Sequence, residues 1–145
     1  MQVVTSASSA FSKSKRLLRH ADFQRVYQSG RRQFTGNMTV FFLRRSAAAD
    51  GDQATMRVGL TVGRVLGEAV ERNRIKRRMR QAVGKSWPPA EAAVDVVFNP
   101  RKSVLDLPFT DVVQEVSRGL QLALQRAREA QDAPPARPRK RKGTQ

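Results

Sequence analysis

Hydrophobic and polar residues alternate along this chain with two different periods, and each period predicts a different secondary structure. Apolar residues three and four positions apart form one face of a helix, and residues 21–29 show this spacing at Phe23, Val26 and Tyr27. A run of β-branched and aromatic residues is typical of a strand that is apolar on both faces, and residues 37–43 show this pattern. The first predicted elements are therefore a short amphipathic helix and a strand.

The same two periods continue through the rest of the chain. Residues 57–63 alternate between apolar and small or polar side chains, and residues 94–98 are almost entirely apolar, so both segments predict strands. Residues 71–84 and 109–128 have the spacing of amphipathic helices. The predicted order is helix, strand, strand, helix, strand, helix, which fits an α+β fold with helices packed on one sheet.

Composition divides the chain into one domain and two tails. Its 145 residues suit a single hydrophobic core. Residues 1–14 are rich in Ser and contain no acid, so we expect a flexible basic arm. Residues 131–145 are basic and rich in Pro, which predicts a disordered tail. The predicted domain is 15–130, with a polar loop at 46–54.

A large excess of positive charge indicates a polyanionic partner. The chain has 28 Lys and Arg but 12 Asp and Glu, for a net charge of +16 and a pI near 11.7. This charge destabilises the compact state unless RNA, DNA or an anionic membrane neutralises it. The absence of Cys excludes disulfides and favours a reducing cytoplasm. No run of apolar residues is long enough for a transmembrane helix.

The helix predicted at 71–84 carries most of this chemistry. Its first ten residues, ERNRIKRRMR, hold six basic residues and one acid. On a helical wheel Ile75 and Met79 face the sheet, and a basic stripe faces away from it. The stripe comprises Arg72, Asn73, Arg74, Lys76, Arg77 and Arg80. An ordinary solvated face mixes charges of both signs, whereas Arg guanidinium groups match phosphate oxygens, so we interpret the stripe as a phosphate-binding surface.

Three aromatic residues predict a second binding surface. Phe23 and Tyr27 lie on a helix with many basic neighbours, and Phe41 lies on the adjacent predicted strand. Basic grooves with aromatic platforms hold single-stranded nucleic acid. The alternative is that Phe23 and Tyr27 are core residues, and the sequence pattern alone leaves both interpretations open.

Residues for protein-borne catalysis are missing. The chain has one His, His20, and its acids are scattered, so neither a histidine acid–base pair nor a two-metal carboxylate site is indicated. Phosphate-binding loops and nucleophile motifs are also absent. We therefore predict a binding protein with no catalytic residues and no metal ligands of its own.

Residues 57–83, RVGLTVGRVLGEAVERNRIKRRMRQAV, closely resemble the signature of the bacterial ribonuclease P protein component. Residues 16–32 and 94–101 resemble the first helix and a later strand of the same family, so the similarity spans roughly residues 14–125. The resemblance implies an α/β sandwich, a ribosomal-protein-like domain whose mixed sheet contains a left-handed β–α–β crossover.

The resemblance also implies a function. The chain would be the protein subunit of ribonuclease P, which removes the 5′ leader from precursor tRNA in the cytoplasm. The basic stripe would bind the catalytic RNA in a 1:1 complex, and that RNA, with Mg²⁺, would carry out the cleavage. The leader would lie in a cleft lined by Phe23, Tyr27, Phe41 and Arg64.

One departure and several alternatives accompany this interpretation. Family members often carry a basic pair where this chain has Gly63, Arg64 and Val65, so one basic contact near the leader is expected to be lost. A ribosomal or general RNA-binding protein without a role in cleavage would share the charge but not the signature. A DNA-binding protein is disfavoured because no helix-turn-helix spacing precedes residue 71. A membrane partner is not expected.

Overall fold

The computed structural model describes residues 15–45, 55–89 and 92–132. Its elements are α2 (His20–Ser29), β1 (Arg31–Phe34), β2 (Met38–Arg44), β3 (Met56–Leu60), the 3-10 turn η2 (Arg64–Leu66), α3 (Ala69–Ser86), β4 (Val94–Pro100), the 3-10 turn η3 (Lys102–Leu105) and α4 (Phe109–Asp132). Among the described helices, none is both long and apolar enough to cross a membrane.

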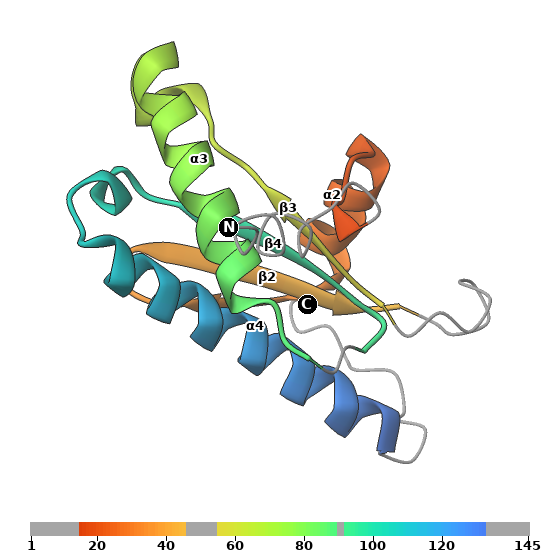
Figure 1. The fold of residues 1–145 in the computed structure, drawn as a ribbon. Coiled ribbons are helices and arrows are strands. Elements are labelled where there is room, and N and C mark those ends of the chain that lie inside the picture. Colours follow the sequence, from red (N-terminus) through yellow and green to blue (C-terminus); the bar gives the residue numbers. More distant parts are fainter. Residues whose placement is uncertain (1–14, 46–54, 90–91, 133–145) are drawn as a thin grey trace.

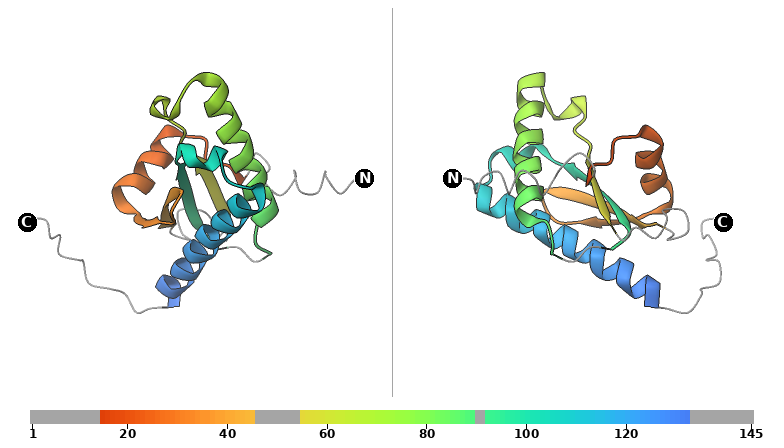
Figure 2. Two further views of the ribbon diagram at one scale, coloured as in Figure 1. Left: turned by 90° about the vertical axis from the view of Figure 1, so that its left-hand side faces the viewer. Right: turned by 45° about the vertical axis from the view of Figure 1, so that its right-hand side comes forward.

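The strands form one mixed sheet between two unequal helical layers. The strand order is β1-β2-β4-β3, in which β1, β2 and β4 pair antiparallel and β3 pairs parallel with β4. Helices α3 and α4 cover one face of the sheet and α2 lies on the other (Figures 1 and 2). The α+β class and the single sheet are therefore confirmed.

The parallel strands β3 and β4 are joined through α3. In Figure 1, α3 passes in front of the sheet, both strands run towards the left, and β4 lies below β3. With the strands turned to point upward, the second strand lies to the left of the first. The crossover is therefore left-handed, as the family resemblance implied, although most such connections are right-handed.

The main core lies between the sheet and the pair α3 and α4. Every second residue of β2, β3 and β4 points into it, which is the expected alternation of a strand with one buried face. The buried strand residues there are Met38, Val40, Phe42, Met56, Val58, Val94, Val96 and Phe98. A smaller cluster on the opposite face contains Leu17, Val26 and Val97, with Phe23, Phe41 and Leu43 packed against it.

Some boundaries differ from the sequence predictions. Strand β1 was not predicted, because all four of its side chains are exposed and no apolar alternation marks it. Strand β3 ends at Leu60 rather than at residue 63, because Gly63 is already the N-cap of η2. Helix α4 extends to Asp132, two residues into the predicted tail. The predicted arm, the loop at 46–54 and residues 133–145 lie outside the described residues.

Candidate nucleic-acid interfaces

Helix α3 presents the basic stripe because its apolar residues fix its rotation. Ile75, Met79, Ala82 and Val83 are all buried against the rest of the core, as the helical wheel predicted. The stripe on the other side consequently points away from the sheet. Asn73, Arg74, Arg77 and Arg80 are exposed, whereas Arg72 and Lys76 at its borders are half-buried.

The structure divides the basic side chains of α3 into two groups. Arg72 donates from Nε to the Gly67 carbonyl at 3.1 Å, and Arg78 donates to the Leu107 carbonyl. These two residues therefore help to pack the helix. Arg77 and Arg80 make no ion pair with any described residue, so their charges are available to a partner.

The single acid of the segment is already neutralised. Glu71 accepts a hydrogen bond from the Glu68 backbone N–H at 3.2 Å, and its carboxylate lies 3.4 Å from the Lys102 ammonium group. The Glu68 N–H, and after it Lys102, lower the pKa of the Glu71 carboxyl below its ordinary value. Glu71 consequently stays ionised while Lys102 offsets its charge, and the stripe remains basic.

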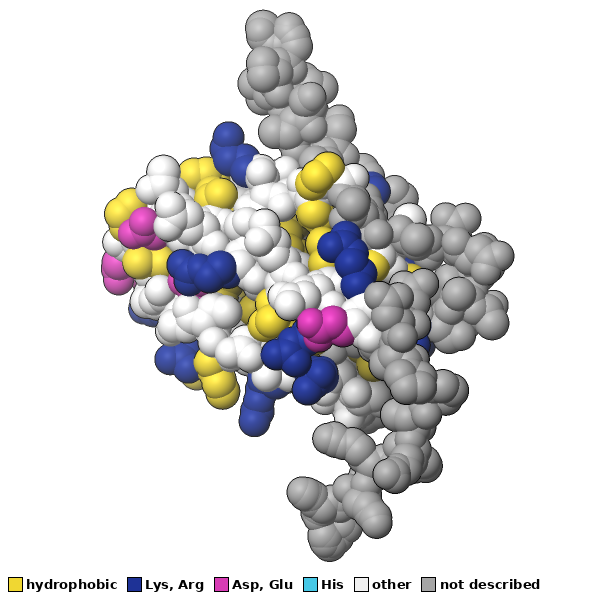
Figure 3. Space-filling view, turned by 90° about the horizontal axis from the view of Figure 1, so that it is seen from below, with side chains coloured by type: hydrophobic (Ala, Val, Ile, Leu, Met, Phe, Trp, Pro, Cys, Tyr) yellow, Lys and Arg dark blue, Asp and Glu magenta, His cyan; other side chains and the backbone are white. Residues whose placement is uncertain are grey.

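Basic side chains on another face are arranged differently. Figure 3 shows the molecule from below, where Lys and Arg side chains form several small, separate groups among apolar and a few acidic side chains. A scattered arrangement of this kind is typical of a solvated surface. The contiguous stripe on α3 is therefore the better candidate for a phosphate backbone.

The second predicted surface lies where α2 crosses the sheet. Phe23 rests on Gly59 of β3, where an added Cβ would come within 2.5 Å of the Phe23 ring. The glycine thus allows the ring to lie against the strand backbone. Phe23 and Phe41 are half-buried against the small cluster of Leu17, Val26 and Val97. These two rings therefore take part in the packing of α2 on the sheet.

Tyr27 is the exposed member of this aromatic set. It is 36% exposed, and its ring meets that of Phe41 edge to face with a centroid distance of 4.8 Å. Its hydroxyl lies 2.6 Å from Thr61 Oγ1 and donates to Asn99 Oδ1 at 3.0 Å. The structure therefore brings Phe23, Tyr27 and Phe41 together, with the Tyr27 ring fixed over β3 and β4.

Arg64 stands apart from these rings. It is exposed on η2, three residues beyond Thr61, and its side chain makes no hydrogen bond, ion pair or ring contact with another described residue. The residues on either side of Arg64, Gly63 and Val65, are also exposed but carry no charge. Its predicted role at the leader stays a prediction.

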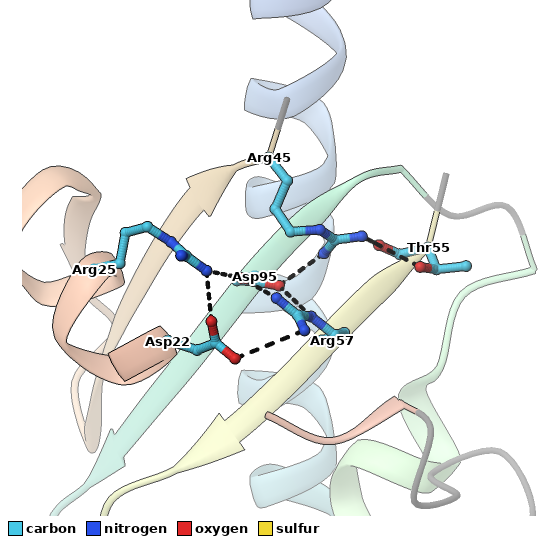
Figure 4. Close-up of polar contacts among 6 residues, drawn as sticks. All are labelled: Asp22, Arg25, Arg45, Thr55, Arg57 and Asp95. Carbon is cyan, nitrogen blue, oxygen red and sulfur yellow. Dashed lines mark hydrogen bonds and ion pairs between the residues drawn. The ribbon is translucent and has the colours of Figure 1, made fainter. Parts of the chain in front are cut away.

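A buried ion cluster attaches α2 to the sheet beside the aromatic set. Its members are Asp22, Arg25, Arg45, Arg57 and Asp95, drawn in Figure 4. The Asp95 carboxylate is fully buried and accepts from Arg45 Nη1 at 2.7 Å and from Arg57 Nε and Nη2 at 2.9 and 2.8 Å. Arg45, 8% exposed, also donates to the Thr55 carbonyl at 2.6 Å.

Helix α2 joins this cluster through two residues. Asp22 Oδ1 accepts from Arg25 Nη2 at 2.6 Å, and Asp22 Oδ2 lies 3.8 Å from Arg57 Nη1. Arg25 Nη2 is also 4.0 Å from Asp95 Oδ2. Because Asp22 directly precedes Phe23, these contacts fix the part of α2 that carries the aromatic residues.

Comparison with known proteins identifies the family. Residues 11–124 match the family model described as Ribonuclease P. The chain belongs to the ribonuclease P protein family. The ribonuclease P protein component of Symbiobacterium thermophilum is 38% identical over 104 residues, 72% of this chain and 86% of that protein. That of Chloroflexus aurantiacus is 38% identical over 109 residues, 74% of this chain and 76% of its own length.

Solved structures of ribonuclease P proteins share the fold. The Staphylococcus aureus protein superposes with a TM-score of 0.62 at 27% identity, over 77% of this chain and 96% of its own. The Thermotoga maritima protein gives a TM-score of 0.61 at 24% identity, over 74% of this chain and 96% of its own. At this identity the likeness supports the fold alone. The role of this chain is thus that of a ribonuclease P protein subunit, rather than that of a ribosomal or general RNA-binding protein.

Sequence reasoning missed several residues of this ribonuclease P protein. Thr61 and Asn99, which hold the Tyr27 hydroxyl, gave no signal because their meeting with Tyr27 depends on the fold. Asp95 could have been found from the sequence, because a carboxylate inside an otherwise apolar strand requires a buried partner. The composition of the strand alone could not say which arginines supply it.

Proposed function

We propose that this chain binds the catalytic RNA of ribonuclease P through the basic stripe of α3. The observation that carries the proposal is the pair Arg77 and Arg80, exposed on one helix face without ion-pair partners among the described residues. Like charges on one helix face repel each other, and phosphate groups relieve that repulsion. Family membership makes a ribonuclease P RNA the natural partner.

The α2 face would then hold the 5′ leader of precursor tRNA. Single-stranded RNA binds by stacking its bases on aromatic side chains beside basic groups. Tyr27 supplies an exposed ring on this face, and Phe23 and Phe41 lie beside it as half-buried supports. The proposed surfaces lie on opposite sides of the sheet, so one molecule has room for both RNAs.

In this proposal the catalytic RNA, rather than the protein, binds Mg²⁺ and cleaves the precursor. Among the described residues, no group of three or more His, Asp or Glu side chains comes together that could hold a metal ion. Mg²⁺ prefers oxygen ligands and commonly uses phosphate oxygens, which the RNA supplies. The protein residues would bind and orient the two RNAs and raise the local concentration of positive charge. We further propose a 1:1 complex with the RNA in the cytoplasm, with neither DNA nor membrane as partner.

The leader surface can be tested at Tyr27. Tyr27→Ala should weaken binding of precursor tRNA to the reconstituted holoenzyme by about 1–3 kcal/mol, the value of one stacked base. Mature tRNA should bind nearly unchanged, because it shares the tRNA body but lacks the leader. Measuring both affinities for each variant cancels the contribution of the body.

Two further variants separate stacking from packing. Gln28→Ala, also exposed on α2, should leave both affinities unchanged. Phe23→Ala removes a ring that packs on Gly59, so it should also lower the melting temperature. Equal weakening of precursor and mature tRNA by Tyr27→Ala, in a protein that melts normally, would rule out a leader surface at this residue.

The absence of protein-borne catalysis can be tested at His20. This residue is exposed at the start of α2, and His20→Ala should leave cleavage by catalytic RNA, protein and Mg²⁺ within a few fold of normal. A general acid–base group typically contributes about 10²–10⁴-fold. A loss of that size with RNA binding intact would assign a chemical role to the protein, as would cleavage by the protein without RNA.

A further inference from the structure

The edge strand β1 places a second exposed aromatic on the face that carries Tyr27. In the register of the sheet, Arg32 lies opposite Phe41, and Phe34 lies opposite Thr39. Alternate residues of a strand share a face, so Arg32 and Phe34 point to the side on which Phe41 meets Tyr27. Arg31, opposite the core residue Phe42, points to the other side.

Phe34 is unusually open for a large apolar side chain. It is 56% exposed, and the Arg32 guanidinium group lies 5.4 Å from the centre of its ring. An exposed aromatic beside an arginine combines a stacking surface with a positive charge, the two features that hold single-stranded nucleic acid. β1 contains no acid that would repel a phosphate backbone.

A polar row of the sheet connects Phe34 with Tyr27. Phe34 pairs with Thr39, and Thr39 pairs with Asn99, which accepts the Tyr27 hydroxyl. Neighbouring strands lie about 4.8 Å apart, so Phe34 and Asn99 are separated by about 10 Å across the sheet. At roughly 3.4 Å or more per nucleotide, a strand of nucleic acid covers this distance in about three nucleotides or fewer.

The turn that follows Phe34 is held by a buried carboxylate. Glu115 of α4 accepts hydrogen bonds from Thr35 Oγ1 at 2.6 Å, from Asn37 N at 2.7 Å and from Asn37 Nδ2 at 3.0 Å. Gly36, between them, has a φ of 101° that favours glycine. The hairpin is therefore anchored to α4, so Phe34 occupies a defined position rather than a loose edge.

We propose that Phe34 and Arg32 form a second platform for the single-stranded leader, beyond the nucleotides that meet Tyr27. This inference rests on the leader surface proposed above and extends it across the sheet to β1. The leader would run along the row of Thr39 and Asn99 and place a more distant nucleotide on the Phe34 ring. Precursors whose leaders are too short to reach β1 would make only the Tyr27 contact.

The test is a series of precursor tRNAs whose leaders are lengthened one nucleotide at a time. With the wild-type holoenzyme, affinity should rise in two steps as the leader reaches first Tyr27 and then Phe34. Phe34→Ala should remove the second step alone, weakening long-leader precursors about fivefold to tenfold, the lower part of the range for one stacked base. Phe34→Tyr keeps the ring and should retain the second step.

Arg32→Gln and Arg31→Gln form a matched pair on opposite faces of one strand. Arg32→Gln should lower the second step, and Arg31→Gln should leave it unchanged. If Phe34→Ala keeps both steps, or weakens every length including mature tRNA, the β1 platform is wrong while the Tyr27 surface stands. If the wild type shows no dependence on leader length, the proposed function itself fails, and the platform fails with it.

Discussion

Replacing Asp95 by Ala should lower the free energy of unfolding by about 3–5 kcal/mol, the usual cost of removing one partner from a buried ion pair. The fully buried carboxylate accepts hydrogen bonds from Arg45 and Arg57. Without it, the buried Arg45 guanidinium loses the carboxylate that faces its Nη1, while its Nη2 still donates to Thr55. Because whole domains are stable by only about 5–15 kcal/mol, chemical denaturation should show a large shift of the midpoint.

Two variants make this result specific to the Asp95 ion cluster. Asp106→Ala removes an exposed carboxylate and should change stability by less than about 0.5 kcal/mol. Adding Arg45→Met to Asp95→Ala should restore part of the loss, because it removes one of the two charges that the Asp95 carboxylate balances. A loss of no more than about 1 kcal/mol for Asp95→Ala, the value of an exposed ion pair, would contradict the importance of the cluster.

The cluster also explains how stability and binding are connected in this fold. It joins α2, β2, β3 and β4 through Asp22, Arg45, Arg57 and Asp95, and Asp22 immediately precedes Phe23. Among the apolar residues of α2 only Val26 is fully buried, and the half-buried Phe23 ring packs on Gly59. The ion cluster and these apolar contacts together set the position of α2, and with it the position of the Tyr27 hydroxyl beside Asn99.

The sequence predicted those elements in which apolar residues recur with a regular helical or strand spacing. Ile75 and Met79 recur with the helical spacing, so both the helix and the outward direction of the basic stripe could be derived from them. Strand β1 has no such signal, because Arg31, Arg32, Gln33 and Phe34 are all exposed at the sheet edge. Its pairing depends on the turn that Glu115 holds from 78 residues away.

The two proposed binding surfaces also differ in how far the sequence could predict them. The basic stripe lies within one helix and is visible in ten consecutive residues. The α2 face combines residues from distant segments, as Tyr27 and Asn99 are separated by 72 positions. The sequence predicted the rings of Phe23 and Tyr27 but could not show that Phe23 packs inward on Gly59 while Tyr27 remains open.

Replacing Arg77 and Arg80 together by Ala should weaken binding to the catalytic RNA by up to a few kcal/mol. A hydrogen bond to a charged group is worth about 1.5–3 kcal/mol, and both side chains are exposed without ion-pair partners among the described residues. The plot of log affinity against log salt should become shallower, because each lost phosphate contact lowers the slope by about one. The melting temperature should stay near that of the wild type.

A control variant with the same change in net charge shows whether the loss of RNA affinity depends on where the charges are removed. Arg118 and Arg126 are exposed on α4, so replacing both by Ala also removes two positive charges. If the stripe is an RNA surface, this α4 variant should keep most of the affinity and most of the salt dependence. Long-range attraction to a protein of charge +16 would instead weaken both double variants equally. Equal losses would therefore contradict the assignment of α3, whereas a selective loss with the α3 variant would place the phosphate contacts on its outward face.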